Sequence, residues 1–159
     1  MTLAPAKREV LVPLIAEQRP KIVVIVGAYV GYFALMLGGA LVALYGRENV
    51  ELGECKVFSF EKDPMCAAVS SSFVELAGLK GVIDVVFGKA AVQMRRLKEE
   101  GKLERVDVLL LDHCEKVYVE NFKVVELGLL TEGSVIVADN VVYSWCAGVF
   151  GVCEGWGGL

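Results

Sequence analysis

Five short apolar runs, each separated from the next by a segment of helix length, limit the folds open to this chain more than any other feature. The runs are rich in Val, Ile, Leu and Phe. They are nearly continuous rather than alternating, which is typical of parallel strands buried on both faces. We expect strands at residues 22–26, 56–60, 82–87, 106–111 and 134–138. Strands that alternate with helices indicate right-handed crossovers, and they predict an α/β fold with an open, mainly parallel sheet and helices on both faces.

The segments between the runs carry helix signals. Asp63 suits an N-cap, Pro64 suits the first position of the helix that follows, and Gly78 suits its end. In residues 90–100, apolar and charged side chains fall on opposite faces of a helix. We expect helices over residues 7–17, 31–45, 64–77, 90–100 and 118–130.

Residues 22–45 contain no charged side chain and are long enough to cross a bilayer as a helix. Gly27 and Gly31 also have the spacing of packed membrane helices. The alternative is a buried strand, a glycine turn and a buried helix, and this alternative keeps the first strand in the regular series. We therefore favour the second interpretation and expect no membrane span.

Charge and cysteine content narrow the partners and the location. The formal net charge is -4 and no basic run occurs, so nucleic acid is not an expected partner. The five cysteines include no CxxC pair, which argues against a disulfide framework and favours a reducing compartment. Charged residues 7–9 interrupt the N-terminus early, unlike a signal peptide. These observations predict a cytoplasmic protein.

The residues that follow the first two strands are candidate site residues, because ligands of open parallel sheets bind beyond the carboxyl ends of the strands. Gly27 and Gly31 allow either a close approach of the backbone to a ligand or close packing of two segments. Glu61 suits an acceptor for both hydroxyl groups of a ribose, and it equally suits a charge that stabilises the start of a helix.

Acids and an amide follow the last two strands. Asp112 and His113 come after the fourth strand, and Asp139 and Asn140 come after the fifth. Asp112, Asp139 and Asn140 offer the hard oxygen ligands that Mg²⁺ prefers, although Asp and Asn also favour strand-end turns. A single histidine is more often a packing or hydrogen-bonding residue than a ligand, so His113 indicates little by itself.

Five colinear segments together resemble the catechol O-methyltransferases over residues 5–142. They read GAYVGY, FEKDPMCAAV, FVELAGL, LLLDH and GSVIVADNV. The resemblance implies a Rossmann-like fold that binds S-adenosylmethionine (SAM). It also implies transfer of a methyl group from SAM to a hydroxyl of a small catechol, assisted by Mg²⁺.

The resemblance assigns roles to particular residues. The cofactor-binding residues that it implies are Gly27, Ala28 and Tyr29 beside the methionine part, Glu61 at the ribose, Gly88 and Asp112, and His113 on the adenine side. The Mg²⁺ ligands that it implies are Asp112, Asp139 and Asn140. The family's catalytic lysine falls at Glu115, which makes the neighbouring Lys116 the candidate base.

Among the positions that depart from the family pattern, three lie at the cofactor site. Ile25 stands where the family has an acid, and Ala90 and Ala91 stand where it has a hydroxyl and an amide. Because each lost hydrogen bond lowers affinity, the departures predict a weakened cofactor site. Two functions therefore stay open: an impaired methyltransferase, or a catalytically inactive homologue that acts as a cofactor-binding or interaction domain.

The end of the chain also departs from the family, which continues beyond the ADN segment with a helix and two further strands. Here the glycine-rich residues 143–159 follow, without helical or strand periodicity. We expect one methyltransferase-like domain over residues 1–142 that lacks the last two strands, and an aberrant tail over residues 143–159. Without those neighbours the fifth strand would be an apolar edge, which predicts self-association.

Overall fold

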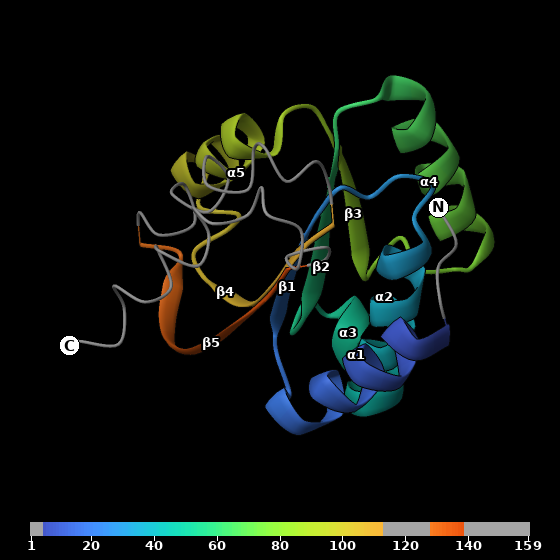
Figure 1. Cartoon of the computed structure of the whole chain (residues 1–159), viewed down its shortest axis with the longest axis vertical. Helices are drawn as coiled ribbons and strands as arrows, with labels where there is room; N and C mark the ends of the chain where they lie inside the picture. The colour runs from blue at the N-terminus through green and yellow to red at the C-terminus, as the bar shows by residue number, and fades with distance from the viewer. Residues whose placement is uncertain (1–4, 113–127, 139–159) are drawn as a thin grey trace.

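The computed structural model describes residues 5–112 and 128–138, in which helices alternate with parallel strands (Figure 1). The helices are α1 (Pro5–Gln18), α2 (Tyr32–Tyr45), α3 (Arg47–Glu51), α4 (Pro64–Leu76) and α5 (Ala90–Glu99). The strands are β1 (Ile22–Val26), β2 (Lys56–Glu61), β3 (Ile83–Phe87), β4 (Val106–Leu111) and β5 (Leu130–Ala138). The predicted tail over residues 143–159 lies outside the described residues.

The five described strands form one sheet in the order β3-β2-β1-β4-β5, and all neighbouring pairs are parallel. This confirms the predicted α/β class and its parallel sheet. Most boundaries agree with the sequence prediction to within two residues, but β5 begins at Leu130 rather than at the predicted residue 134. The helix expected over residues 118–130 is wrong at its end, because Leu130 begins β5 and the Leu129 carbonyl accepts a hydrogen bond from the Val106 N–H. The short helix α3 was not predicted.

The continuous apolar runs are explained by burial of both sheet faces. Val23 and Ile25 of β1 point into a core shared with α1, α2, α3 and α4, whereas Val24 and Val26 point into a core shared with α5. All four side chains are at most 3% exposed. Figure 1 shows α5 on one side of the sheet and the other helices on the opposite side. Each fully buried side chain of this kind stabilises the fold by about 1.5–3 kcal/mol.

The uncharged residues 22–45 are divided into β1, a glycine turn and α2, as the favoured interpretation predicted. Helix α2 buries Phe33, Leu37 and Leu41 against the sheet. Within the described residues, no helix combines the length and the apolar character needed to cross a membrane. The apolar character of α2 is accounted for by its place in the core.

Two adjacent glycines of α2 provide a matched test of this packing. A Cβ added at Gly38 would lie 2.6 Å from Ile83 Cδ1, whereas one added at Gly39 meets nothing within 4 Å. We expect Gly38→Ala to lower the free energy of unfolding by about 1–3 kcal/mol through overpacking. Gly39→Ala should raise it by about 0.5–1 kcal/mol, because alanine is the better helix former. Urea unfolding of both variants measures the contrast, and equal effects would contradict this packing.

Candidate functional site

The carboxyl ends of the strands lie in register along one edge of the sheet. Val26 pairs with Phe60 on one side and with Leu111 on the other, and Glu61 pairs with Phe87. Neighbouring parallel strands are about 4.8 Å apart, so the ends of β3, β2, β1 and β4 are spread over only about 14 Å. The predicted site residues Gly27, Glu61, Gly88 and Asp112 are therefore brought together at this edge.

Backbone hydrogen bonds fix the residues that follow the strands. The Gly27 N–H donates to the Phe60 carbonyl at 3.0 Å, and the Gly88 N–H donates to the Glu61 carbonyl at 2.8 Å. The Asp112 N–H donates to the Val26 carbonyl at 2.9 Å. Each strand end is thus attached to the neighbouring strand, which gives the edge a defined geometry.

The turn after β1 depends on residues with positive φ. Gly27 has φ 98°, Tyr29 has φ 46° and Gly31 has φ 89°. The N–H groups of Gly27 and Ala28 both donate to the Phe60 carbonyl, which folds the turn onto β2. A Cβ at Gly31 would lie 2.5 Å from Ser70 Oγ, so Gly31 permits close packing against α4. Of the two roles open for these glycines, packing therefore applies to Gly31. Gly27 serves the turn after β1, and a close approach of a ligand to it stays a prediction.

The Glu61 carboxylate is held at both of its oxygens by backbone groups. The Tyr29 N–H donates to Oε2 at 2.7 Å, and the Asp63 N–H donates to Oε1 at 2.8 Å. The residue is buried, with 9% of its surface exposed. Because the two N–H groups come from the β1–α2 turn and from the start of α4, they fix the carboxylate between these two segments.

A second acid fills the helix-start role that remained open for Glu61. Asp63 is the N-cap of α4, and its Oδ1 accepts hydrogen bonds from the N–H groups of Met65 and Cys66, both at 2.9 Å. The hydrogen bond from the Cys66 N–H is the main cause that holds the pKa of Asp63 below its usual value. Since Asp63 caps the helix, the Glu61 carboxylate is left to face the edge of the sheet.

Cys66 lies in the first turn of α4, close in sequence to Glu61 at the carboxyl edge of the sheet. Burial, and then the negative charge of Asp63, raise the pKa of the Cys66 thiol. A raised pKa keeps the thiol protonated, so its position in the first turn of α4 does not make it a nucleophile.

The three departures from the family pattern are buried in the structure. Ile25 is fully buried in the core beneath α2, and it pairs in register with Ser59 and Leu110. Ala90 and Ala91 are each 8% exposed and pack into the core beneath α5. These positions supply packing rather than polar groups, and the weakened cofactor site stays a prediction.

The remaining predicted site residues lie outside the described part of the chain. They are His113, Lys116, Asp139 and Asn140. Leu111 pairs with Ala138, so the residues that precede Asp112 and Asp139 in sequence are neighbours in the sheet. Residues 5–112 and 128–138 contain no group of three or more metal-binding side chains. Because two of the three proposed Mg²⁺ ligands are outside these ranges, the Mg²⁺ site stays a prediction.

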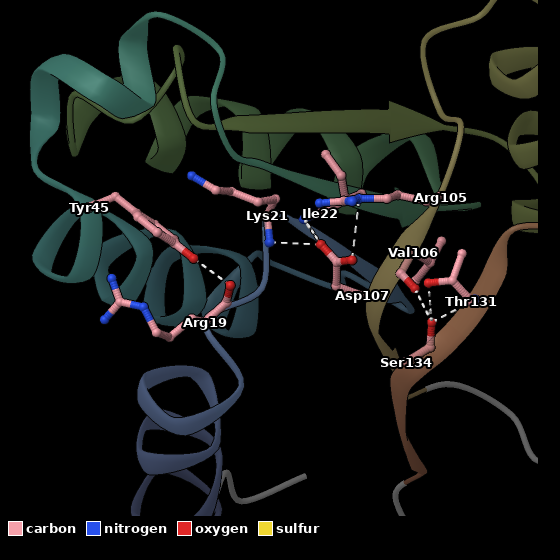
Figure 2. A network of polar contacts seen from close by, with 9 residues as sticks. All are labelled: Arg19, Lys21, Ile22, Tyr45, Arg105, Val106, Asp107, Thr131 and Ser134. Carbon is pink, nitrogen blue, oxygen red and sulfur yellow. Dashed lines mark hydrogen bonds and ion pairs between the residues drawn. The ribbon is translucent and has the colours of Figure 1, made fainter.

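A hollow of about 140 Å³ lies at the opposite edge, where β1 and β4 begin. Asp107 lines it, and Figure 2 shows that its carboxylate oxygen Oδ2 accepts hydrogen bonds from the backbone N–H groups of Lys21 (2.7 Å) and Ile22 (2.8 Å). Arg105 also approaches this carboxylate, with Nε 3.4 Å from Oδ1. These contacts tie the start of β1 to β4. The hollow is shallow and at the amino ends of the strands, and we assign its polar groups to the fold rather than to the candidate site.

One polar residue at the carboxyl edge was missed by sequence reasoning. Gln93 of α5 has a side chain that folds back over Gly88, and a Cβ added at Gly88 would lie 2.7 Å from its Nε2. The available signal was the pair Ala90 and Ala91, which left the start of α5 without the expected amide.

A parallel α/β sheet with a glycine turn after β1 and a fixed acid at the end of β2 defines a Rossmann-like domain with its candidate site at the carboxyl edge. The family profile described as O-methyltransferase matches residues 1–151. The chain belongs to the O-methyltransferase family, and the resemblance found in the sequence is confirmed.

Individual relatives agree with this placement. Catechol O-methyltransferase from Bos taurus is 31% identical over 144 residues, which cover 90% of this chain and 49% of the bovine protein. The O-methyltransferase from Bacillus cereus in complex with SAH has a TM-score of 0.75 at 25% identity, covering 89% of this chain and 59% of that one. TomG from Streptomyces achromogenes in complex with SAM has a TM-score of 0.79 at 20% identity, covering 99% and 70%. The chain spans about half the length of the bovine relative.

Proposed function

We propose that this chain binds SAM at the carboxyl edge of the sheet and transfers its methyl group to one hydroxyl of a small catechol, with assistance from Mg²⁺. The observation that carries the proposal is the buried Glu61 carboxylate, held at both oxygens by backbone N–H groups. Family membership and the likeness to a relative in complex with SAH support the cofactor. The catechol O-methyltransferases among the relatives support the substrate class.

The described residues at this edge suit the cofactor. Each Glu61 oxygen accepts one backbone hydrogen bond and retains capacity for a second donor, which matches the two hydroxyl groups of a ribose. Gly27 has no side chain, so a ligand can approach the turn after β1 closely. Tyr29 and Phe87 are large side chains near this edge that are 58% and 57% exposed, and a bound ligand would cover part of their surface.

The proposed Mg²⁺ ligands also suit their ion, because Asp112, Asp139 and Asn140 all offer hard oxygen atoms. Bound Mg²⁺ would make a catechol hydroxyl easier to ionise, next to the methyl group that bound SAM supplies. The contribution of the chain is then mainly positional. Asp112 follows β4 beside the turn after β1, so a catechol oxygen held there lies close to the methionine side of the site.

Two further roles are proposed for residues outside the described ranges. Lys116 is the candidate base for the catechol hydroxyl, and His113 is the candidate neighbour of the adenine ring. Self-association through β5 also stays a prediction. Within the described residues β5 forms one end of the sheet order, and Val135, Ile136 and Val137 are only partly buried.

A second function is favoured by one observation. Ile25 is fully buried in the core, so the position that carries an acid in the family offers no polar atom to the methionine part of SAM. A chain that binds the cofactor weakly and does not turn it over would act as a cofactor-binding or interaction domain. The two functions differ in turnover, which a single pair of measurements separates.

The test is calorimetric titration of the purified chain with SAM and with S-adenosylhomocysteine (SAH), followed by a methyl-transfer assay with Mg²⁺ and a simple catechol. We expect binding about a hundredfold weaker than at a site that retains the polar partners lost at Ile25, Ala90 and Ala91. Turnover should accordingly be slow. Binding without turnover would favour the second function, and an absence of binding to SAM and SAH would overturn the methyltransferase and the cofactor-binding domain and leave only an interaction domain.

A further inference from the structure

The side chain of Gln93 lies against the backbone of Gly88, in the turn that connects β3 to α5. Gly88 has φ 127°, a conformation that side chains rarely allow. A Cβ at this position would lie 2.7 Å from Gln93 Nε2, 3.1 Å from Cγ and 3.2 Å from Cδ. The absence of a side chain at Gly88 therefore leaves the space that the Gln93 amide occupies.

The Gln93 Oε1 atom is buried and has no hydrogen-bond partner among the described residues. Buried side-chain oxygens in folded proteins almost always accept a hydrogen bond, and an exception calls for a specific explanation. Ser59 Oγ and Ser70 Oγ share this property, but both serines are fully buried between the sheet and α4. Gln93 differs from them because it lies at the edge where the candidate site is.

Gln93 is connected to Glu61 through Gly88, which contacts both residues. The Gly88 N–H donates to the Glu61 carbonyl at 2.8 Å, so Gly88 contacts the end of β2 on one side and the Gln93 amide on the other. In a nucleoside, the base is attached to the carbon next to the one that carries the 2′-hydroxyl. A ribose held by the Glu61 carboxylate therefore carries its base close to the neighbouring strand end.

We propose that Gln93 recognises the adenine ring of the cofactor, with Oε1 accepting a hydrogen bond from the 6-amino group. This inference rests on the proposed binding of SAM. The chemistry is complementary, because the exocyclic amine of adenine is a donor and the unsatisfied Oε1 is an acceptor. Ala90, Ala91 and Val92 carry no polar side-chain atom, so Gln93 is the first residue of α5 that can make such a contact. Gln93 is thus a specificity-determining residue.

The test compares two ligands that differ at this group and at the adjacent ring nitrogen N1, which carries a hydrogen only in the deaminated form. SAH carries the 6-amino group, and its deaminated form, S-inosylhomocysteine, carries a carbonyl oxygen there instead. We expect the unmodified chain to prefer SAH by about tenfold or more in calorimetric titration, because the carbonyl would face the Gln93 oxygen. Gln93→Met, similar in size but without an amide, should bind SAH about tenfold more weakly and show less than about a twofold preference.

Two further variants keep the test decisive. Gln93→Glu retains acceptor oxygens and should retain the preference for SAH, whereas Gln18→Met, the same replacement in α1 at the opposite edge, should change neither affinity. A Gln93→Met chain that keeps the full preference for SAH would overturn the proposal while leaving the proposed cofactor site intact. An unmodified chain that binds neither ligand would instead overturn the cofactor site, and this inference with it.

Discussion

Replacement of Glu61 by alanine is expected to weaken SAH binding by about a hundredfold or more. Each hydrogen bond from a ribose hydroxyl to a carboxylate contributes about 1.5–3 kcal/mol, and Glu61 is positioned to accept two. The carboxylate does not have to be ordered on binding, because the Tyr29 and Asp63 N–H groups already hold it in the free chain. Calorimetric titration of SAH into the variant and the unmodified chain measures the loss.

The control for this experiment is Glu75→Ala. Glu75 lies in α4 and its exposed carboxylate forms a surface ion pair with Lys80 at 2.7 Å, so its removal should leave SAH affinity unchanged. Because Glu61→Ala also leaves the Tyr29 and Asp63 N–H groups without their acceptor, circular dichroism must first show that the variant is folded. If a folded Glu61→Ala chain binds SAH with unchanged affinity, then Glu61 only connects the β1–α2 turn to the start of α4 and does not bind the ribose.

Replacement of Asp112 by alanine is expected to lower methyl transfer by about a hundredfold or more, because metal assistance at a reacting oxygen is worth several kcal/mol. The same variant should lose the increase in Mg²⁺ affinity that a catechol produces in the unmodified chain. The expectation follows from the position of Asp112 after β4, where its N–H is bonded to the Val26 carbonyl. Mg²⁺ titrations with and without a catechol, monitored by calorimetry, provide a readout that does not depend on turnover.

The matched control is Asp84→Ala, which removes an acid from β3, a strand separated from β4 by β2 and β1. Asp84 lies in β3 and forms an ion pair with Lys56 at 3.2 Å, away from the carboxyl edge, so Mg²⁺ and catechol binding should be unaffected. If Asp112→Ala behaves like this control, then Asp112 serves as a strand-end turn residue and the proposed Mg²⁺ site is wrong. Asp139→Ala extends the test to a residue outside the described ranges.

The candidate site was only partly predictable from the sequence. The sequence identified Gly27, Glu61 and Asp112 because each follows or ends an apolar run, and such positions meet at one edge of a parallel sheet, whereas Gly88 was assigned through the family resemblance. It left two roles open for Glu61, since an acid before a helix has the same local pattern in both. The structure shows that Asp63 caps α4, which depends on the geometry of the helix start, and the ribose role of Glu61 stays a proposal.

The role proposed for Gln93 was not predictable from the sequence. Apart from the amide missing at Ala90 and Ala91, the sequence of α5 does not distinguish its side chain from that of an ordinary surface glutamine. Its importance arises from contact with Gly88, a residue of the preceding turn with φ 127°, and from an oxygen that finds no partner among the described residues. Both are properties of atoms packed together rather than of residue order.

The sequence by itself determined the class of the fold, because burial on both faces of a sheet leaves a continuous apolar run in every strand and the segments between the runs have helical length. It also determined that residues 22–45 contain a strand and a helix, since the series requires them. Only the tertiary structure decided the strand order β3-β2-β1-β4-β5 and the two backbone hydrogen bonds that hold the Glu61 carboxylate. The physical reason is that periodicity reports which side chains are buried, whereas strand order and side-chain hydrogen bonds depend on contacts between residues far apart in the chain.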